Sequence, residues 1–381
     1  MRATPSWELF CRVVDNYGDI GVCWRLARQL AGEHGLPVRL WVDDLAALRR
    51  LWPAIDAKRD LQSCAGVEVR RWREPFVPAA PADIVVEAFA CGLPDAQLRA
   101  MAEREKRPLW IILEYLSAEA WVEGCHGLAS PAPRLPLTGH FFFPGFTARS
   151  GGLLREQGLD MQRAAFQADA ATQAAFWREL GLPAPERSEC RVSLFCYPHS
   201  PAASLFACWS RQFRPVTCLV PEGIATAALT ASFGSAAPQA GDVLVSGSLI
   251  VRVLPFLDQD RYDRLLWACD CNFVRGEDSF VRAQWAARPF VWQPYPQSED
   301  AHLQKLEAFL HRYLGGLREE AAAAVTDLWL AWSHGDDPGA AWPAFHAQEE
   351  ILRCHCDRWA AALSEQGDLA GNLLEFCFDR L

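Results

Sequence analysis

The segment Arg275-Gly-Glu-Asp-Ser279 combines residue types that bind anions in proteins. The apolar run before it predicts a buried strand over 271–274, and the residues after it predict a helix with Ser279 as the N-cap. A helix N-terminus offers free backbone N–H groups and a positive dipole end, and an arginine can bind phosphate oxygens in a bidentate way. The segment therefore predicts a phosphate site. A simple turn, in which the arginine pairs with a neighbouring carboxylate, explains the spacing equally well.

A second polar turn, Asp15-Asn-Tyr-Gly-Asp19, lies between an apolar run at 7–14 and a segment of helical periodicity at 22–30. Two carboxylates at this spacing can orient an acceptor group or deprotonate it. Alternatively, Asp15 caps the helix or binds turn amides. Ligands of open α/β sheets bind outside the carboxyl ends of the strands, so both turns can contribute to one site. Carboxylates on one side and an anion clamp on the other suit transfer from a nucleotide sugar.

Both turns belong to chain segments in which strands alternate with helices, a pattern that predicts parallel, doubly wound sheets. In the first half, strands are expected at 7–14, 38–42, 67–72, 83–88 and 109–113, and helices at 22–30, from 43 to Pro53, and at 94–104. Residues 124–152 are rich in Pro and Gly and are expected to be irregular.

In the second half, strands are expected at 192–196, 216–219, 249–254, 271–274 and 289–292. Helices are expected at 163–180, 202–212, 259–268 and 302–313, and then through most of the chain to Leu381, with a linker at 183–188. We expect two Rossmann-like domains that face each other across a cleft. The first is expected to comprise residues 1–180, with a C-terminal helix over 360–381 packed back on it, and the second residues 188–358.

Composition excludes several classes of protein. The 381 residues carry a net charge of -10 with scattered Arg and Lys, which argues against direct nucleic-acid binding. No apolar run is long enough to cross a membrane and no signal-peptide pattern is present, so we expect a cytoplasmic protein. The 14 cysteines form no CxxC pair and are expected to be reduced and buried, without a metal.

Several familiar catalytic motifs do not occur in the sequence. Walker A, GxGxxG, HExxH and GxSxG patterns are all missing, which argues against P-loop NTPases, ordinary dinucleotide dehydrogenases, zincins and α/β-hydrolases. Asp258-Gln-Asp260 has the form of the DxD motif that binds a divalent metal in other sugar transferases. Because it directly precedes a predicted helix, we interpret it as a helix cap.

The combination of motifs resembles one known family. Asp15–Val22, Glu114-Tyr-Leu-Ser117, residues 194–197 and Phe273–Phe280 together resemble the EarP family of bacterial protein-arginine rhamnosyltransferases, which modify translation elongation factor P. The resemblance extends over essentially the whole chain. It implies a GT-B fold, TDP-β-L-rhamnose as the donor, no cofactor or metal, and an arginine of elongation factor P as the acceptor. It also implies inversion to an α-linked product and a role in rescuing ribosomes stalled at polyproline.

The resemblance also assigns catalytic roles. Asp19 is expected to be the catalytic base, with Asp15 beside it to hold the acceptor arginine. A guanidinium is a poor nucleophile because its pKa is above about 12 and its lone pairs are delocalised, so a carboxylate must bind it and accept a proton. Glu277 is expected to place the donor or the transition state, most simply by binding a sugar hydroxyl.

Donor binding is expected to involve both turns and an aromatic site for the base. Arg275 and Ser279 should bind the diphosphate, while Tyr197 and Phe256 stack on the thymine and Gln259 binds its edge. The remaining residues expected to bind the donor are Asn16, Tyr17, Gly18, Glu277 and Asp278. The aromatic residues can equally well be core residues, and Phe195 has the same ambiguity.

Two other functions remain open from sequence. A GT-B small-molecule glycosyltransferase or a nucleotide-sugar epimerase would also use the two aspartates, but with a narrow acceptor pocket. A non-catalytic partner of the translation machinery would not need Asp19 at all.

Overall fold

The computed structural model describes residues 4–14, 17–186, 188–234 and 237–381. The chain divides into two compact units, which are described separately below. Unit 1 comprises Met1–Gln157 and Leu363–Leu381, and unit 2 comprises Gly158–Ala362. Asp15 and Asn16, two of the predicted site residues, lie outside the described residues.

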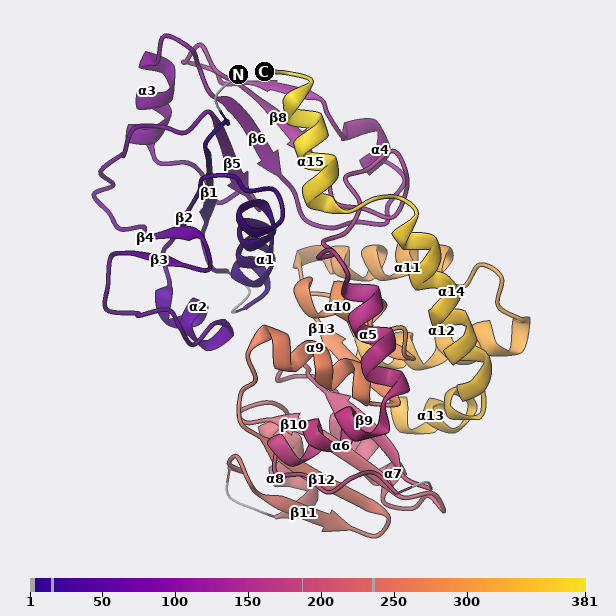
Figure 1. Ribbon diagram of the computed structural model, residues 1–381. Coiled ribbons are helices and arrows are strands. Elements are labelled where there is room, and N and C mark those ends of the chain that lie inside the picture. Colours follow the sequence, from indigo (N-terminus) through magenta and orange to yellow (C-terminus); the bar gives the residue numbers. More distant parts are fainter. Residues whose placement is uncertain (1–3, 15–16, 187, 235–236) are drawn as a thin grey trace. The chain divides into compact units, whose positions relative to one another are not determined.

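Unit 1 is built on a sheet with the strand order β3-β4-β2-β1-β5-β6-β8-β7 (Figure 1). The strands are β1 (Trp7–Cys11), β2 (Val38–Val42), β3 (Leu61–Cys64), β4 (Val67–Arg71), β5 (Ile84–Ala88), β6 (Leu109–Leu113), β7 (Ala129–Pro131) and β8 (Thr138–Phe142). The pairings of β4, β2, β1, β5, β6 and β8 are parallel, and the two edge strands are antiparallel. This is the doubly wound sheet that the sequence predicts, with hairpins added at its edges.

The helices of unit 1 connect these strands and cover the sheet. They are α1 (Gly18–Gly32), α2 (Leu45–Leu51), α3 (Asp95–Glu103), α4 (Val122–Cys125) and α15 (Leu369–Phe378). Asp44 caps α2, because its carboxylate accepts hydrogen bonds from the N–H groups of Ala46 and Ala47. Phe10, Trp41 and Trp72 belong to a buried cluster in this unit, and α1 buries most of its length.

Unit 2 contains a second sheet, with the order β11-β12-β10-β9-β13-β14 (Figure 1). Its strands are β9 (Cys190–Leu194), β10 (Val216–Pro221), β11 (Val243–Ser246), β12 (Leu249–Leu254), β13 (Cys271–Arg275) and β14 (Phe290–Gln293). Only β11 pairs in the antiparallel sense, at one edge of the sheet within the described residues. The central strands β9 and β13 are buried at every position, as expected of a parallel sheet covered on both faces.

The helices of unit 2 make up most of its mass. They are α5 (Leu159–Ala168), α6 (Ala170–Glu179), α7 (Ala202–Trp209), α8 (Thr226–Phe233), α9 (Gln259–Ala268), α10 (Asp278–Trp285), α11 (Ala301–Tyr313), α12 (Glu319–His334), α13 (Pro338–Ala347) and α14 (Glu349–Ser364), with a short 3-10 turn at Ser298–Asp300. Aromatic rings of α10, β14, α11 and α12 pack together; Phe280 and Trp292, for example, stack with centroids 3.9 Å apart.

Some elements differ from the sequence-based predictions. Residues 124–152 are not uniformly irregular, because they contain β7 and β8, and β8 extends the parallel sheet beside β6. The first strand ends at Cys11 and not at residue 14. Strands β3 and β11 and helix α8 were not predicted. These are short elements, and the two strands lie at or beside sheet edges with alternating exposure.

The boundaries of the compact units differ from the expected domains. Helices α5 and α6 were assigned to the first domain but belong to unit 2, where Gln167 donates hydrogen bonds to the carbonyls of Trp267 and Ala286. The chain returns to unit 1 at Leu363, and α15 is held there by contacts with α1. One such contact joins Gln29 Nε2 and Asp368 Oδ1 at 3.0 Å.

The helices formed by the described residues differ from membrane spans in length or in apolar character. None of them combines enough length with enough apolar character to cross a bilayer.

Candidate active site

The Arg275 turn lies where the strand order of unit 2 reverses. The connection from β9 through α7 to β10 runs to one side, and the connection from β13 through α10 to β14 runs to the other. Strands β9 and β13 are therefore parallel neighbours with outgoing connections in opposite directions. The crevice outside such carboxyl ends is the usual ligand position in open α/β sheets. Phe195–Tyr197 follow β9 at this edge, and the Arg275 turn ends β13.

Gly276 fixes the path of this turn. Its φ of 64° lies in the left-handed region, which glycine adopts without a Cβ clash. Its N–H donates to the carbonyl of Gln293 at 3.1 Å, and its carbonyl accepts from Trp292 Nε1 at 2.8 Å. Both polar groups of Gly276 are thus bonded to β14. The turn is held in place by the neighbouring strand.

The helix after the turn begins two residues earlier than predicted. Glu277 is the N-cap residue of α10, without a side-chain capping bond, so the prediction that Ser279 is the N-cap is wrong. The Ser279 hydroxyl instead accepts from the Arg275 N–H at 3.2 Å and donates to the Arg275 carbonyl. Its side chain thereby closes the turn onto the end of β13. Glu277 and Asp278 are half-buried at the helix N-terminus, where the dipole favours carboxylates.

The Arg275 side chain is buried between two aromatic rings. Its guanidinium carbon lies 4.6 Å from the centroid of Phe195 and 4.4 Å from that of Tyr197, and the residue is 8% exposed. Cation–π contacts of this kind orient a planar guanidinium and leave its edge for hydrogen bonds. The sequence predicted that the arginine and Tyr197 belong to one site, and the structure brings them into contact.

The N-terminus of α9 lies at the same edge as that of α10. Gln259, the first residue of α9, donates from Nε2 to Asp278 Oδ2 at 3.3 Å. Asp258 caps α9 by accepting from the Arg261 N–H at 2.9 Å, which confirms its interpretation as a cap. Further along the two helices, Arg282 binds Asp263 through two hydrogen bonds of 3.0 and 2.7 Å, and both side chains are buried. Two helix N-termini are therefore locked side by side.

Two other groups near Arg275 are uncharged at neutral pH. Burial raises the pKa of Tyr262, whose ring packs edge-on against Phe195 with centroids 5.9 Å apart. Burial also raises the pKa of Cys196 to about 12, so this thiol stays protonated and is not a nucleophile. Phe256 lies half-buried in the loop between β12 and α9. Aromatic rings and these two neutral groups therefore make up part of the surroundings of Arg275.

In unit 1, Asp19 lies at the second position of α1, after the carboxyl end of β1. Its Oδ2 accepts from the Val14 N–H at 2.8 Å, and the residue is only 3% exposed. The carboxylate therefore holds a backbone amide of the loop that precedes the helix. For Asp15, binding of turn amides is the predicted alternative to a catalytic role. The structure shows a contact of this kind for Asp19. Asp19 also has contacts beyond this bond.

The other predicted residues of this turn lie at the start of α1. Tyr17 is the N-cap residue, and its hydroxyl accepts from Arg50 NH1 at 2.7 Å. Gly18 begins the helix. These positions are at the carboxyl end of β1, where unit 1 has its own reversal of strand order between β1 and β5.

A strained loop at the same edge of unit 1 was not predicted. Phe89 and Ala90 follow β5 with φ values of 55° and 49°, which non-glycine residues seldom adopt. The ring of Phe89 stacks on Tyr115, which follows β6, with centroids 4.7 Å apart and an interplanar angle of 24°. Strained backbone of this kind is concentrated at functional sites. Backbone strain leaves no signal in a single sequence, which is why the loop was missed.

Gln293 was also missed, although a signal was available. The strand ending near Trp292 was predicted, and the residue after it had to lie at the same edge as the Arg275 turn. Ligands of open α/β sheets bind outside the carboxyl ends of the strands. The same rule, applied to the predicted strand that became β14, would have identified Gln293.

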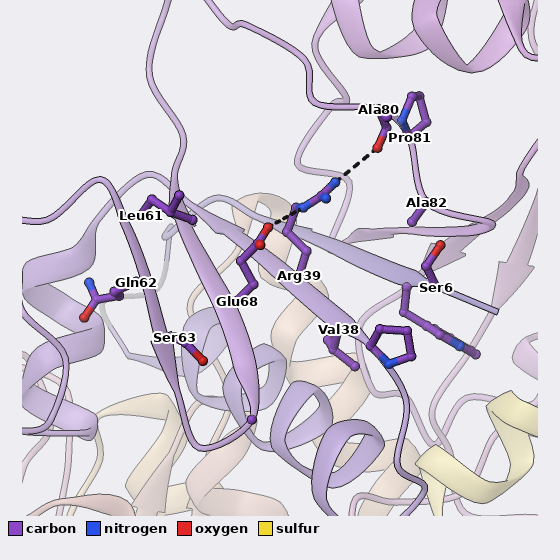
Figure 2. A pocket seen from close by; sticks show the side chains of 13 residues that line it. Ser6, Val38, Arg39, Leu61, Gln62, Ser63, Glu68, Ala80, Pro81 and Ala82 are labelled. Atoms are coloured by element: carbon purple, nitrogen blue, oxygen red, sulfur yellow. Dashed lines mark hydrogen bonds and ion pairs between the residues drawn. The ribbon is translucent and has the colours of Figure 1, made fainter. Parts of the chain in front are cut away.

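A pocket elsewhere in unit 1 lies far from this chemistry. It has a volume of ≈ 600 Å³ and lies at the amino ends of β1, β2 and β4. Figure 2 shows the residues that line it, with Arg39 among them. Asp19, by contrast, follows the carboxyl end of β1. Arg39 is a charged residue that lines this pocket. It binds Glu68 at 2.7 Å and the buried Glu8 at 3.1 Å, and donates to the Ala80 carbonyl at 3.2 Å. The arginine is already satisfied within the protein. The carboxyl edges of the two sheets therefore keep the candidate residues for chemistry.

Potential metal ligands do not gather in the described part of the chain. Within it, no cluster of three or more His, Cys, Asp or Glu side chains is arranged to hold an ion.

Comparisons with known proteins relate this arrangement to a family. Residues 7–378 match the model of the family described as "Elongation-Factor P (EF-P) rhamnosyltransferase EarP". The chain is 50% identical over 376 residues to a protein-arginine rhamnosyltransferase of Pseudomonas putida, covering 99% of both proteins. It is 49% identical to that of Pseudomonas aeruginosa, covering 99% of this chain and 100% of the relative.

Solved structures agree with the fold. A structure described as the basis for EarP-mediated arginine glycosylation of translation elongation factor EF-P has a TM-score of 0.71 and 37% identity, and the match covers 99% of this chain and 100% of that one. The spinosyn rhamnosyltransferase SpnG has a TM-score of 0.50 and 9% identity, covering 97% and 99% of the two chains, a likeness of fold alone. The two α/β units are those of a GT-B glycosyltransferase. From the match along its whole length, the chain belongs to the EarP family of elongation factor P rhamnosyltransferases.

Proposed function

We propose that the protein transfers L-rhamnose from TDP-β-L-rhamnose to an arginine side chain of translation elongation factor P, with inversion at the anomeric carbon and without a metal ion. The observation that carries the proposal is the Arg275 site. A buried guanidinium lies between two aromatic rings at the N-terminus of α10, a combination that suits a nucleoside diphosphate.

Unit 2 is assigned to donor binding. The Arg275 guanidinium and the first N–H groups of α10 bind the diphosphate, and the departing oxygen gains its negative charge there. Tyr197 and Phe256 stack on the thymine, with Gln259 at the base edge. Glu277 and Asp278 bind sugar hydroxyls, because a carboxylate directly beside a phosphate would be repelled. Ser279 contributes through its backbone N–H, since its hydroxyl is bonded to Arg275.

Unit 1 is assigned to the acceptor. A guanidine nitrogen attacks the anomeric carbon from the face opposite the diphosphate, and the carbon–oxygen bond breaks with its electron pair on the diphosphate. The proton of the attacking nitrogen goes to Asp19, while Asp15 holds the rest of the guanidinium. For this step the Asp19 carboxylate must turn from the Val14 N–H towards the substrate. A single displacement gives inversion, and the product is an α-rhamnosyl arginine.

The test is intact mass spectrometry of elongation factor P incubated with this protein and TDP-β-L-rhamnose. We expect a gain of one deoxyhexose, mapped to an arginine by fragmentation, and an α-linkage by NMR of the modified peptide. The reaction should proceed in EDTA. No gain on the cognate factor would contradict the proposal.

Further reactions separate the other candidate functions. Consumption of TDP-rhamnose without elongation factor P would indicate a small-molecule acceptor, and a changed sugar still attached to TDP would indicate an epimerase. Full activity of Asp19→Asn would contradict the assignment of Asp19 as the base. If elongation factor P were modified equally well without this protein, the protein would be a non-catalytic partner.

A further inference from the structure

Gln293 ends β14 at the edge of the sheet that carries the Arg275 site. It is the register partner of Arg275 in the β13–β14 pair, and it is 3% exposed. A buried glutamine needs hydrogen-bond partners, because an unsatisfied amide costs free energy. Which groups it bonds therefore indicates what it holds in place.

The backbone of Gln293 forms a hydrogen bond with the Arg275 turn. Its carbonyl accepts from the Gly276 N–H at 3.1 Å, while the preceding Trp292 binds the Gly276 carbonyl through Nε1. Gly276 has no remaining backbone group to rotate towards a ligand. The N–H groups that follow it, at the start of α10, are thereby aimed in a fixed direction.

The side chain of Gln293 bonds the aromatic segment after β9. Its Oε1 accepts from the Ser200 hydroxyl at 2.5 Å and, in a long contact of 3.5 Å, from the Tyr197 N–H. Ser200 closes the turn at this segment, because its N–H donates to the Tyr197 carbonyl at 3.1 Å. Tyr197 in turn packs on the guanidinium of Arg275. Gln293 thus joins three strand ends, those of β9, β13 and β14.

We propose that Gln293 is a positioning residue for donor binding, which holds the Tyr197 ring and the Gly276 turn in the relative positions that a nucleoside diphosphate requires. This inference rests on the proposed function, since it assumes that unit 2 binds the donor. Gln293 acts through Tyr197 and Gly276 and is not assigned a contact with the substrate. Its loss should therefore weaken donor binding without removing any group that binds the donor.

The test compares Gln293→Met with a matched control, Gln284→Met. Methionine has a similar volume to glutamine but no acceptor oxygen, so the Ser200 hydroxyl loses its partner. Gln284 is 1% exposed on α10 and accepts from Trp359 Nε1 at 2.9 Å, so its replacement also costs a buried hydrogen bond in unit 2. We expect Gln293→Met to weaken binding of TDP and of TDP-rhamnose about tenfold by calorimetry, equivalent to about 1.4 kcal/mol. The donor KM should rise accordingly, with kcat within about twofold.

Gln284→Met should lower the melting temperature by a similar amount and leave the Kd for TDP unchanged. If both variants weaken TDP equally, or if Gln293→Met binds TDP like the wild type, Gln293 is only a structural residue and the inference is overturned. Binding of TDP-rhamnose to the wild-type protein is measured first. Failure at that step contradicts the proposed function itself, whereas failure confined to the variant contradicts only the role of Gln293.

Ser200→Ala provides a second route that does not depend on the folding of Gln293→Met. It should weaken TDP binding in the same direction and by a smaller factor, because the turn keeps its backbone bond. The double variant should bind TDP no more weakly than Gln293→Met alone, since both changes remove one interaction. Additive losses, or normal TDP binding by Ser200→Ala, would overturn the proposed link through Ser200.

Discussion

The turn after β1 in unit 1 and the turn after β13 in unit 2 are built in different ways. The turn of unit 2 is tied to β14 through both polar groups of Gly276, and its arginine is held by two rings. In unit 1, by contrast, Asp19 uses one of its own carboxylate oxygens to hold the Val14 N–H. One turn is fixed by its surroundings, and the other is fixed partly by the side chain of Asp19, the proposed base.

The difference fits the two chemical tasks that we propose for these turns. A diphosphate is negatively charged before and after transfer. Hydrogen-bonding groups that are already in position therefore stabilise it throughout the reaction. A base must exchange its partner for a substrate during the reaction, so a bond to a replaceable backbone amide is suitable for it. We therefore expect substitutions in the two turns to change different kinetic parameters.

The largest expected effect is that of Asp19→Asn. The asparagine oxygen still accepts from the Val14 N–H, so the loop should keep its conformation, but the base is lost. We expect kcat for modification of elongation factor P to fall about 10³- to 10⁴-fold, with the Kd for TDP-rhamnose unchanged. Rapid-quench assays and calorimetry measure the two quantities. A loss of donor affinity equal to the loss of kcat would remove the distinction between the turns.

Asp263→Ala tests the rigidity of unit 2. It leaves Arg282 buried without its carboxylate partner, which should cost about 3 kcal/mol of unfolding free energy. Denaturant unfolding followed by Trp fluorescence measures this change. Asp260→Ala, an exposed position on the same helix, is the control and should cost about 0.5 kcal/mol or less. Equal effects of the two substitutions would mean that α9 and α10 are not held together by the buried pair.

Arg275→Lys separates charge from geometry in the donor site. Lysine keeps the positive charge but cannot present a planar, bidentate group between Phe195 and Tyr197. We expect the Kd for TDP to rise about tenfold, and about a further tenfold in Arg275→Ala, with smaller effects on kcat. Calorimetry with TDP measures both variants, and Arg261→Lys at an exposed position is the control. If Arg275→Lys binds TDP normally, charge alone accounts for the site.

The smallest expected effect is a pH dependence of the stability of unit 1. Burial lowers the pKa of His126, whose Nδ1 accepts from the Phe143 N–H at 3.1 Å. The folded pKa lies below the unfolded value of about 6.5, so stability is complete above that pH and is lost as the pH falls through it. One proton changes the unfolding free energy by at most about 1.4 kcal/mol per pH unit.

His126→Gln should make the unfolding free energy depend less on pH, because glutamine keeps an acceptor for the Phe143 amide and does not titrate. Unfolding curves at about pH 7.5 and about pH 5.5 measure the change. His355 in unit 2 also has a pKa lowered by burial, but its Nε2 bonds the Tyr313 carbonyl at 2.7 Å and keeps that bond when protonated. His355→Gln should therefore reduce the pH dependence of the unfolding free energy less than His126→Gln does. The reverse order would contradict the role given to the Phe143 bond.

The parts of the site that follow from periodicity and turn chemistry were predictable from the sequence. The strand before Arg275 and the helix after it were found, as was the cap at Asp258, because each depends on neighbouring residues. The role of Ser279 was not, since a serine in the first turn can cap the helix or bond the preceding strand, and only the path of the backbone decides. Gln293 and the Phe89 loop depend on which strands become neighbours, which is information that local patterns do not contain.

The same limit explains the error at 124–152. Proline and glycine in that segment mask a five-residue strand, β8, whose place beside β6 is set by the sheet. The GT-B fold and the family, on the other hand, were found from four short motifs at the correct spacing.

The return of the chain to unit 1 has a consequence for its synthesis. Leu369, Leu373 and Cys377 of α15 are buried in unit 1, but they leave the ribosome only after the whole of unit 2 has been made. Unit 2 is continuous in sequence and can fold as soon as it emerges, while unit 1 must wait with part of its apolar surface uncovered. Unit 1 can therefore complete its apolar core only after unit 2 has been synthesised.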